Sequence, residues 1–395
     1  MRYDFAELKK RNSMALQDLK AEGMSVVGTF CTYSPKELIY AAGAVPVSLC
    51  ASDEGPINAA HAELPRNLCP LIKASYGYAL TKKCPYMNAS DVVVGETTCD
   101  GKKKMYELLA KHKEVRVLEL PNMTNKRSLE LWTQELREFK GYLEQRFGTQ
   151  ITDEKLKETI EIFNEERDAL NELMELGKLN PSPISGSEMH QVLFASDYIY
   201  DKSEKIRMLR SYVKALREKD MSGAKRKKRI IITGCPSGGI YEKVVKQIEE
   251  LGADVVAFEN CTGTKNYQNN VELEGDLVAN IAERYLKIPC SVMYQNDARG
   301  DIIKEFIREY QAHGVIDVVL SGCHTYAIET NRIKEASREA GANYMSLETD
   351  YSKQGRRANS NAPRSVYRTA LSWVALNFKI KEPCKFNNPK KGEIA

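Results

Sequence analysis

The chain has 395 residues, of which 42% are hydrophobic and 28% charged, so two or three domains can each bury a core. The net charge of +4 is small for this length and gives no reason to expect a nucleic-acid or membrane-surface partner. The first twenty residues have no signal-peptide core and no apolar run is long enough to span a bilayer, so we expect a cytoplasmic protein.

Residues 1–125 predict an N-terminal helix followed by alternating strands and helices. The helix, at 1–24, has a predicted apolar side made of Phe5, Leu8, Met14, Leu16 and Leu19. Short β-runs follow at 25–30, 45–49, 91–94 and 115–120, with helical segments between them. Ser34 to Glu37 has the pattern of a capping box with proline at N1. The alternation is typical of a parallel α/β sheet.

Residues 126–225 predict a helical insertion. Apolar residues recur at helical spacing in two series, Leu129, Trp132, Leu136, Phe139 and Leu143, then Leu156, Ile160, Phe163, Leu170 and Leu173. Thr152 and Ser185 have the sequence context of helix starts. The charged side chains are interpreted as a solvated face. The basic run at 225–229 directly precedes a strand and is interpreted as a linker edge, not as a nucleic-acid site.

Residues 226–395 predict a second α/β half. Its strands are expected at 230–233, 253–258, 317–320 and 344–348, and helices at 241–251, 301–313 and 362–378. The predicted fold class is therefore α/β, with two Rossmann- or flavodoxin-like lobes that contain parallel sheets, plus a helical insertion. The predicted domains are 1–125, 126–225 and 226–395.

The chain contains ten cysteines, an unusual number for a cytoplasmic protein of this size. A single cysteine is most often a buried structural residue, and disulfides are not expected in a reducing compartment. Seven of the ten, however, lie at or just beyond predicted strand ends or at short entry loops, namely Cys31, Cys50, Cys99, Cys235, Cys261, Cys290 and Cys323. Randomly placed structural cysteines would favour the interiors of strands and helices, so this bias predicts a site.

The position of these cysteines suggests where the site lies. Ligands of parallel sheets bind beyond the carboxyl ends of the strands, so Cys99 and Cys323 are expected to face one another across a cleft. No C-x-x-C pair is present, which argues against a zinc ribbon, a thioredoxin motif or a ferredoxin run. Many soft thiolates with few neighbouring histidines or carboxylates favour an iron–sulfur cluster over zinc.

Other candidate motifs are weaker. The loop from Gly95 to Gly101, followed by Lys102, does not have P-loop spacing. The loop at 234–239 opens a predicted helix; it could bind an anion, but we expect its glycines to permit close approach of a neighbouring backbone. His324 is the one histidine placed for chemistry, and a structural role is favoured for it. The lysines at 102–104 are interpreted as a solvated helix start, with an anionic substrate or a partner as the alternative.

At these loops the sequence resembles the 2-hydroxyacyl-CoA dehydratase component family, also called the benzoyl-CoA reductase subunit family, and within it the double-cubane-cluster anaerobic reductases. RNLCPLIK (66–73) and TTCDGKKK (97–104) are the most specific of the stretches that carry the resemblance. The others are FCTYSPKELIYAAGAVPVSLC (30–50), ENCTG (259–263), IPCSVM (288–293), SGCHTY (321–326) and LETDYS (347–352).

The resemblance implies a set of cluster ligands. Members of the family hold a [4Fe-4S] cubane with three thiolates, which match Cys69, Cys99 and Cys323. The double-cubane members hold two bridged cubanes, [8Fe-9S], and need three more thiolates, for which we expect Cys31, Cys261 and Cys290. Cys235 is the alternative member of the second set. Cys50, Cys84 and Cys384 are expected to be structural.

The resemblance also implies a function. We expect an ATP-dependent iron–sulfur oxidoreductase, active as a homodimer, that reduces a small molecule at low potential. Its electrons would come from a separate ATP-hydrolysing activator that carries its own [4Fe-4S] cluster. The alternative is one subunit of a 2-hydroxyacyl-CoA dehydratase, a lyase, with a single [4Fe-4S] cluster. A non-catalytic cluster carrier or scaffold is a third possibility. No nucleic-acid or membrane partner is expected.

Overall fold

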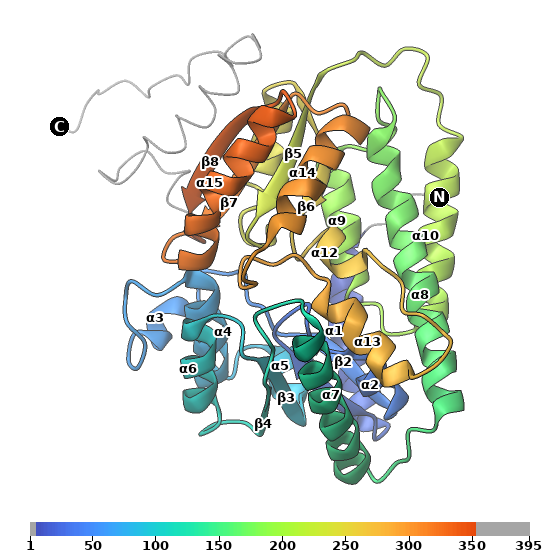
Figure 1. Ribbon diagram of the computed structural model, residues 1–395, viewed down its shortest axis with the longest axis vertical. Coiled ribbons are helices and arrows are strands. Elements are labelled where there is room, and N and C mark those ends of the chain that lie inside the picture. The colour runs from blue at the N-terminus through green and yellow to red at the C-terminus, as the bar shows by residue number, and fades with distance from the viewer. Residues whose placement is uncertain (1–4, 353–395) are drawn as a thin grey trace, which may run out of the picture.

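Two four-stranded parallel sheets organise the chain, one in the lower and one in the upper half of Figure 1. The structure, a computed structural model, describes residues 5–352, so the helix expected at 362–378 and Cys384 lie outside the described residues. The α/β fold class with two flavodoxin-like lobes is confirmed. Within 5–352, no helix is long and apolar enough to cross a membrane.

The first sheet has the strand order β2-β1-β3-β4 with parallel pairing throughout. Its central strands are buried on both faces, which explains their near-continuous valine runs. The strands are β1 (Ser25–Thr29), β2 (Ala44–Ser48), β3 (Val92–Glu96) and β4 (Val115–Leu118). The helices of this lobe are α1 (Phe5–Ala21), α2 (Lys36–Ala41), α3 (Ile57–Ala60), α4 (Pro70–Thr81), α5 (Pro85–Ala89) and α6 (Asp100–Leu109).

The second sheet repeats this topology with the order β6-β5-β7-β8, again all parallel. In both sheets the first strand lies between the second and the third, the arrangement that opens a ligand crevice at the strands' carboxyl ends. The strands are β5 (Lys228–Gly234), β6 (Ala253–Glu259), β7 (Gly314–Leu320) and β8 (Asn343–Thr349). The helices are α11 (Val245–Glu250), α12 (Thr264–Tyr267), α13 (Leu277–Leu286), α14 (Asp297–Glu309) and α15 (His324–Glu339).

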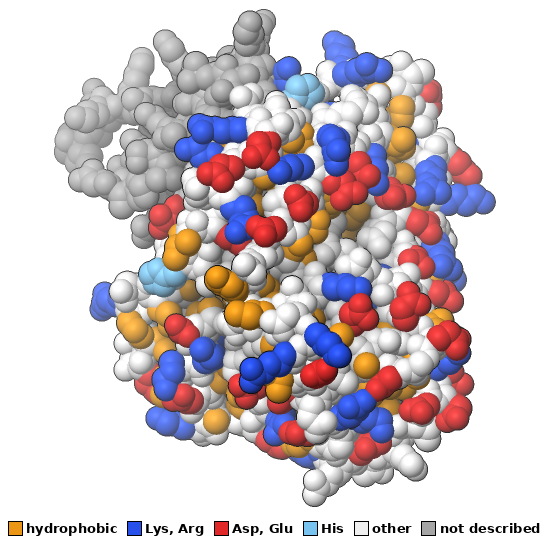
Figure 2. Space-filling view, in the orientation of Figure 1, with side chains coloured by type: hydrophobic (Ala, Val, Ile, Leu, Met, Phe, Trp, Pro, Cys, Tyr) orange, Lys and Arg blue, Asp and Glu red, His pale blue; other side chains and the backbone are white. Residues whose placement is uncertain are grey.

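The helices that lie between the two sheets in the sequence contact both lobes as a group. They are α7 (Lys126–Phe147), α8 (Asp153–Glu175), the short 3-10 helix η1 (Leu176–Lys178), α9 (Gly186–Ser196) and α10 (Lys202–Arg217). α7 lies beside α13, a helix from the second half of the chain, over the first sheet, and α9 packs on both α1 and β6 (Figure 1). The visible surface mixes charges of both signs, and hydrophobic side chains gather near the middle of the molecule (Figure 2).

Several local predictions can be compared with the structure. The side-chain oxygens of Thr152 and Ser185 accept hydrogen bonds from the backbone N–H three residues on, so both helix starts are confirmed. Met14 is 61% exposed, so its placement on the apolar side of the first helix is wrong.

The predicted capping box is also wrong. Ser34 donates a hydrogen bond to the carboxylate of Glu96, and Glu37 is fully buried where it binds Arg167 and the hydroxyl of Tyr285. These two side chains form long-range contacts, and neither caps α2.

A buried ion cluster joins α8 to α10. Glu166 of α8 binds both Lys202 and Lys205 of α10, and the three side chains are 12% exposed or less. Burial alone would raise the pKa of Glu166, but the two ammonium groups outweigh burial and hold this pKa well below its ordinary value. The carboxylate therefore stabilises the folded state in its charged form.

We predict that Glu166→Gln lowers the free energy of unfolding by about 3–5 kcal/mol at pH 7, because Lys202 loses its carboxylate partner and Lys205 keeps only Asp197, at 3.7 Å. Since the folded pKa is depressed, the contribution of the carboxylate is fully present above the ordinary glutamate pKa of about 4.3 and is lost as pH falls below it. Denaturant midpoints of wild type and variant should therefore converge on acidification. Glu165→Gln, at an exposed pair with Arg210, is the control and should change stability by less than about 1 kcal/mol. A gap that stayed constant down to pH 3 would contradict this account.

Candidate functional site

A cavity of about 280 Å³ lies where the carboxyl ends of the two sheets meet, and eight cysteines line it. Six of them follow strand ends: Cys31, Cys50 and Cys99 after β1, β2 and β3, and Cys235, Cys261 and Cys323 after β5, β6 and β7. The other two are Cys69, before α4, and Cys290, after α13. The six residues predicted as ligands therefore all border one cavity.

The remaining cysteines are placed differently. Cys50 also lines the cavity, where its thiol donates to the carbonyl of Phe30 at 2.8 Å; its expected structural role stays a prediction. Cys84 is the N-cap residue of α5, where its sulfur accepts a hydrogen bond from the N–H of Met87 at 3.4 Å. It is not among the residues that line the cavity.

Close backbone contact between the lobes brings the cysteine loops together. Gly322, with φ of +76°, leaves no room for a side chain: a Cβ there would lie 2.5 Å from the carbonyl oxygen of Asn67 and 3.2 Å from the amide nitrogen of Cys69. The loop that carries Cys323 thus lies directly on the loop that carries Cys69. Likewise, a Cβ on Gly239 would lie 2.3 Å from the carbonyl of Ser52, so the expected close approach at 234–239 is confirmed.

Three thiols are positioned at helix N-termini. Cys69, Cys99 and Cys323 are the N-cap residues of α4, α6 and α15. The partial positive charge of a helix N-terminus stabilises a thiolate, as it does other anions. Serine, threonine, asparagine and aspartate are the usual N-cap residues. Cysteine at three such positions around one cavity therefore indicates thiolate chemistry.

The thiols form two groups. In the first, Cys235 and Cys69 hydrogen-bond to Cys323; these bonds lower the pKa of Cys323 to about 3, and the shared bond raises that of Cys69. Burial, followed by the bond to Cys323, raises the pKa of Cys235. The group thus stabilises one thiolate between two thiols.

The second group consists of Cys31, Cys261 and Cys290. Burial raises the pKa of Cys31, and the nearby sulfurs of Cys261 and Cys290 add to this effect. Burial and the neighbouring Cys290 raise the pKa of Cys261 to about 11. Cys99 lines the same cavity and contributes to the field at the Lys102 amine.

Lys102 borders the cavity, so its interpretation as part of a solvated helix start is wrong. Its amine donates to the carbonyl of Phe30 at 2.8 Å. The interpretation does hold for Lys103 and Lys104, which are exposed and pair with Asp100 at 2.8 Å and Glu107 at 2.6 Å. One lysine of the run thus faces the thiols and two face solvent, as the rotation of a helix requires.

A buried polar network that sequence reasoning missed lies beneath the second thiol group. The hydroxyl of Tyr326, which lines the cavity, is 4.0 Å from the sulfur of Cys290. Lys265 donates to this hydroxyl at 3.0 Å and pairs with Glu259 at 3.0 Å, and Arg299 binds Glu259 from the other side at 3.3 Å. The only available signal was that Glu259 closes β6, two residues before the predicted site residue Cys261.

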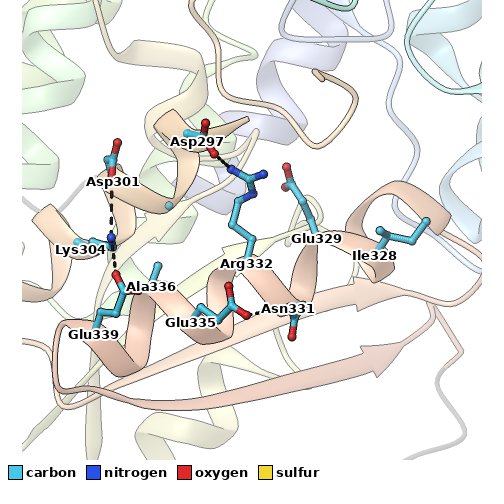
Figure 3. A pocket seen from close by; sticks show the side chains of 11 residues that line it. Asp297, Asp301, Lys304, Ile328, Glu329, Asn331, Arg332, Glu335, Ala336 and Glu339 are labelled. Atoms are coloured by element: carbon cyan, nitrogen blue, oxygen red, sulfur yellow. Dashed lines mark hydrogen bonds and ion pairs between the residues drawn. The ribbon is translucent and has the colours of Figure 1, made fainter. Parts of the chain in front are cut away.

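A second hollow, of about 610 Å³, lies between α14 and α15 but contains no cysteine (Figure 3). Polar side chains that line it are paired with one another: Arg332 with Asp297, Lys304 with Glu339 at 2.6 Å, and Glu335 with Asn331 at 3.0 Å. Chemistry-bearing groups therefore gather in the thiol-lined cavity and not here.

The lining of the thiol cavity favours one kind of cofactor. Within residues 5–352, no group of three or more His, Cys, Asp or Glu side chains is arranged around a position for a single metal ion. Soft thiolates that enclose a hollow, with His324 as the one histidine among the lining residues, fit an iron–sulfur cluster better than a mononuclear zinc site.

The fold and the site define the class of this protein: two parallel α/β lobes whose strand ends carry cysteines into one shared cavity. The family described as 2-hydroxyglutaryl-CoA dehydratase, D-component, matches residues 31–363, and the chain belongs to this family. The family expected from RNLCPLIK and TTCDGKKK is thus confirmed. The chain is a component of the dehydratase and reductase enzymes of the 2-hydroxyacyl-CoA dehydratase and benzoyl-CoA reductase type.

Relatives match along most of their length. The chain is 45% identical over 352 residues to YjiM of Escherichia coli (strain K12), provisionally named a dehydratase subunit, with 88% of this chain and 92% of the relative covered. It is 25% identical to the (R)-phenyllactyl-CoA dehydratase beta subunit of Clostridium sporogenes, covering 88% and 91%. It is 24% identical to a benzoyl-CoA reductase subunit of Thauera aromatica, covering 82% and 84%.

We predict that Gly322→Ala destabilises the chain by about 1–3 kcal/mol more than Gly341→Ala, because its Cβ would collide with the Asn67 carbonyl. Gly341 has a similar φ, +78°, and a Cβ there would have no atom within 4 Å, so it reports the backbone strain alone, about 1–2 kcal/mol. Denaturant unfolding of the two variants checks this expectation. Equal losses would show that the loops do not depend on the close contact.

Proposed function

We propose that the chain is an iron–sulfur reductase that transfers low-potential electrons to a small molecule, with its cluster held in the thiol-lined cavity. The observation that carries this proposal is the convergence of eight cysteines, from both lobes, on one hollow of about 280 Å³. Isolated structural thiols would be distributed through the core. Here, instead, six of them occupy the strand ends at which parallel sheets place their ligands.

The second thiol group and the three helix N-termini suggest which residues would hold the cofactor. Cys31, Cys261 and Cys290 would provide one set of three thiolates. Cys69, Cys99 and Cys323, at the three helix N-termini, would provide the other. Six thiolates correspond to the double-cubane [8Fe-9S] cofactor, which supplies one-electron transfer at low potential when bound. Cys235 donates to Cys323 and has no helix start behind it, which supports a role as a neutral neighbour.

The residues around the thiols would control the environment of the cofactor. The side chains of Leu71, Ile72 and Tyr351 line the cavity and restrict the access of water. The hydroxyl of Tyr326, supported by Lys265, lies within reach of the Cys290 sulfur. Hydrogen bonds and burial of this kind set the reduction potential of iron–sulfur sites.

Electrons are proposed to come from a separate ATP-hydrolysing protein with its own [4Fe-4S] cluster, and the chain is proposed to form a homodimer in the cytoplasm. The sequence contains no P-loop motif, in keeping with ATP being hydrolysed by the partner. The relatives named as dehydratase beta subunits or as a reductase subunit belong to multi-subunit enzymes, which supports dependence on other chains.

The second candidate is a subunit of a 2-hydroxyacyl-CoA dehydratase with one [4Fe-4S] cluster. The name of the relative from Clostridium sporogenes, a dehydratase beta subunit, favours it. In that case only the set around Cys69 and Cys323 would bind iron, and Cys261 would be dispensable for it.

Iron content separates the two candidates. We expect about eight irons per chain after anaerobic reconstitution, against about four for the dehydratase subunit. Cys261→Ala should lose about half of the iron or more, because one set of three thiolates becomes incomplete. Cys84→Ser, outside the cavity, is the control and should keep the wild-type content. Full iron retention in Cys261→Ala would contradict the six-thiolate proposal.

A second pair of variants tests the choice between Cys99 and Cys235. We predict that Cys99→Ala loses iron, because a helix N-terminus supports its thiolate, whereas Cys235→Ala keeps most of it. Iron and sulfide analysis together with EPR spectra of both reconstituted variants provides the measurement. The opposite pattern would exchange the roles of these two residues.

A further inference from the structure

The amine of Lys102 lies at the thiol cavity and, among the described residues, is not paired directly with a carboxylate. Its hydrogen-bond partner is the neutral carbonyl of Phe30, at 2.8 Å. In the described part of the chain, no carboxylate lies within 4.0 Å of this amine. The charge of Lys102 does influence Glu96, but burial raises the pKa of this carboxyl to about 7, and its side chain is bound to Ser34 and not to the amine. A desolvated cation that lacks an anionic partner is unfavourable.

Lys102 is half-buried, and the lysines that are more deeply buried in the described residues have carboxylate partners. Lys205, 1% exposed, pairs with Glu166, and Lys265, fully buried, pairs with Glu259 at 3.0 Å. Lys102 instead faces sulfur: the thiols of Cys31, Cys50 and Cys99 are the groups whose negative charge would favour its protonated form, together with the hydroxyl of Tyr106. The neutralising charge is therefore expected inside the cavity.

The carbonyl of Phe30 fixes the amine in place. The thiol of Cys50 donates to the same oxygen at 2.8 Å, so one acceptor orients both groups. Because the Cys50 thiol donates its proton in this bond, the bond favours the neutral form of Cys50. Cys50 differs in this respect from the cysteines proposed as ligands, which would bind iron as thiolates. Lys36 also lines the cavity, but its charge lowers the pKa of Cys50 less than the charge of Lys102 does.

We propose that Lys102 is the fixed counter-ion of the anionic iron–sulfur group, a positioning residue that stabilises the loaded site and raises its reduction potential. This inference rests on the proposed function. A reduced cluster carries one more negative charge than an oxidised one, so a nearby fixed cation stabilises the reduced form more. In the iron-free protein the same cation destabilises the folded state, because no anionic cluster is present to neutralise its charge.

The test compares Lys102→Met with Lys103→Met, which removes the same charge from an exposed residue one position along the same helix. EPR-monitored redox titration of the reconstituted proteins gives the midpoint potential. We expect Lys102→Met to lower the ratio of reduced to oxidised cluster at a fixed potential at least tenfold, about 59 mV for a one-electron couple. Lys103→Met should change it less than threefold, because solvent screens exposed charges.

Melting curves of the iron-free and loaded proteins provide a readout that does not depend on electron transfer. We expect Lys102→Met to melt at or above the wild-type temperature without iron and below it when loaded, a reversal that Lys103→Met should not show. Lys102→Gln, which removes the charge but retains a donor for the Phe30 carbonyl, is measured alongside and should behave like Lys102→Met.

The outcomes distinguish the two proposals. Wild-type protein that takes up no iron would overturn the proposed function itself. Wild-type protein that loads normally, with Lys102→Met and Lys102→Gln matching Lys103→Met in potential and in melting, would overturn the counter-ion role alone. If Lys102→Met does not fold, the comparison of Lys102→Gln with Lys103→Met decides in the same way.

Discussion

The contact between the Gly322 backbone and the Asn67 carbonyl determines what the rest of the site can be. Each parallel sheet, taken alone, has a shallow crevice at its carboxyl edge. Where Gly322 leaves no side chain between them, the two edges meet closely and form one hollow, and loops that are hundreds of residues apart in sequence line it together. Helix α8 contacts α2 of the first lobe and α12 of the second, and α13 from the second half of the chain packs beside α7; both contacts help to maintain this arrangement (Figure 1).

The electrostatics of the cavity follow from that geometry. Three helix N-termini point at it through Cys69, Cys99 and Cys323, and the amine of Lys102 adds a full positive charge from α6. The negative charge of Glu259, a carboxylate close to the cavity, is neutralised by ion pairs with Lys265 and Arg299. These positive charges favour anionic sulfur, the state that binds iron, and oppose the burial that raises the pKa of Cys31, Cys235 and Cys261.

The sequence predicts the two lobes well because valine- and isoleucine-rich runs bounded by glycine and proline are local signals. It also places the thiols at strand ends, since that position depends only on where each strand stops. It fails where the deciding partner is remote in sequence. Ser34 and Glu37 have the local pattern of a cap but bind Glu96 and Arg167, and Cys50 and Lys102 meet at the carbonyl of Phe30. None of these contacts leaves a local pattern.

The central claim is that iron is bound between the lobes by thiolates from both of them. Anomalous diffraction at the iron absorption edge, from crystals of the anaerobically reconstituted protein, tests this claim most directly. The account predicts strong iron peaks inside the cavity bounded by Cys31, Cys69, Cys261, Cys290 and Cys323. Iron located elsewhere on the chain, or coordinated by thiolates from one lobe alone, would contradict it.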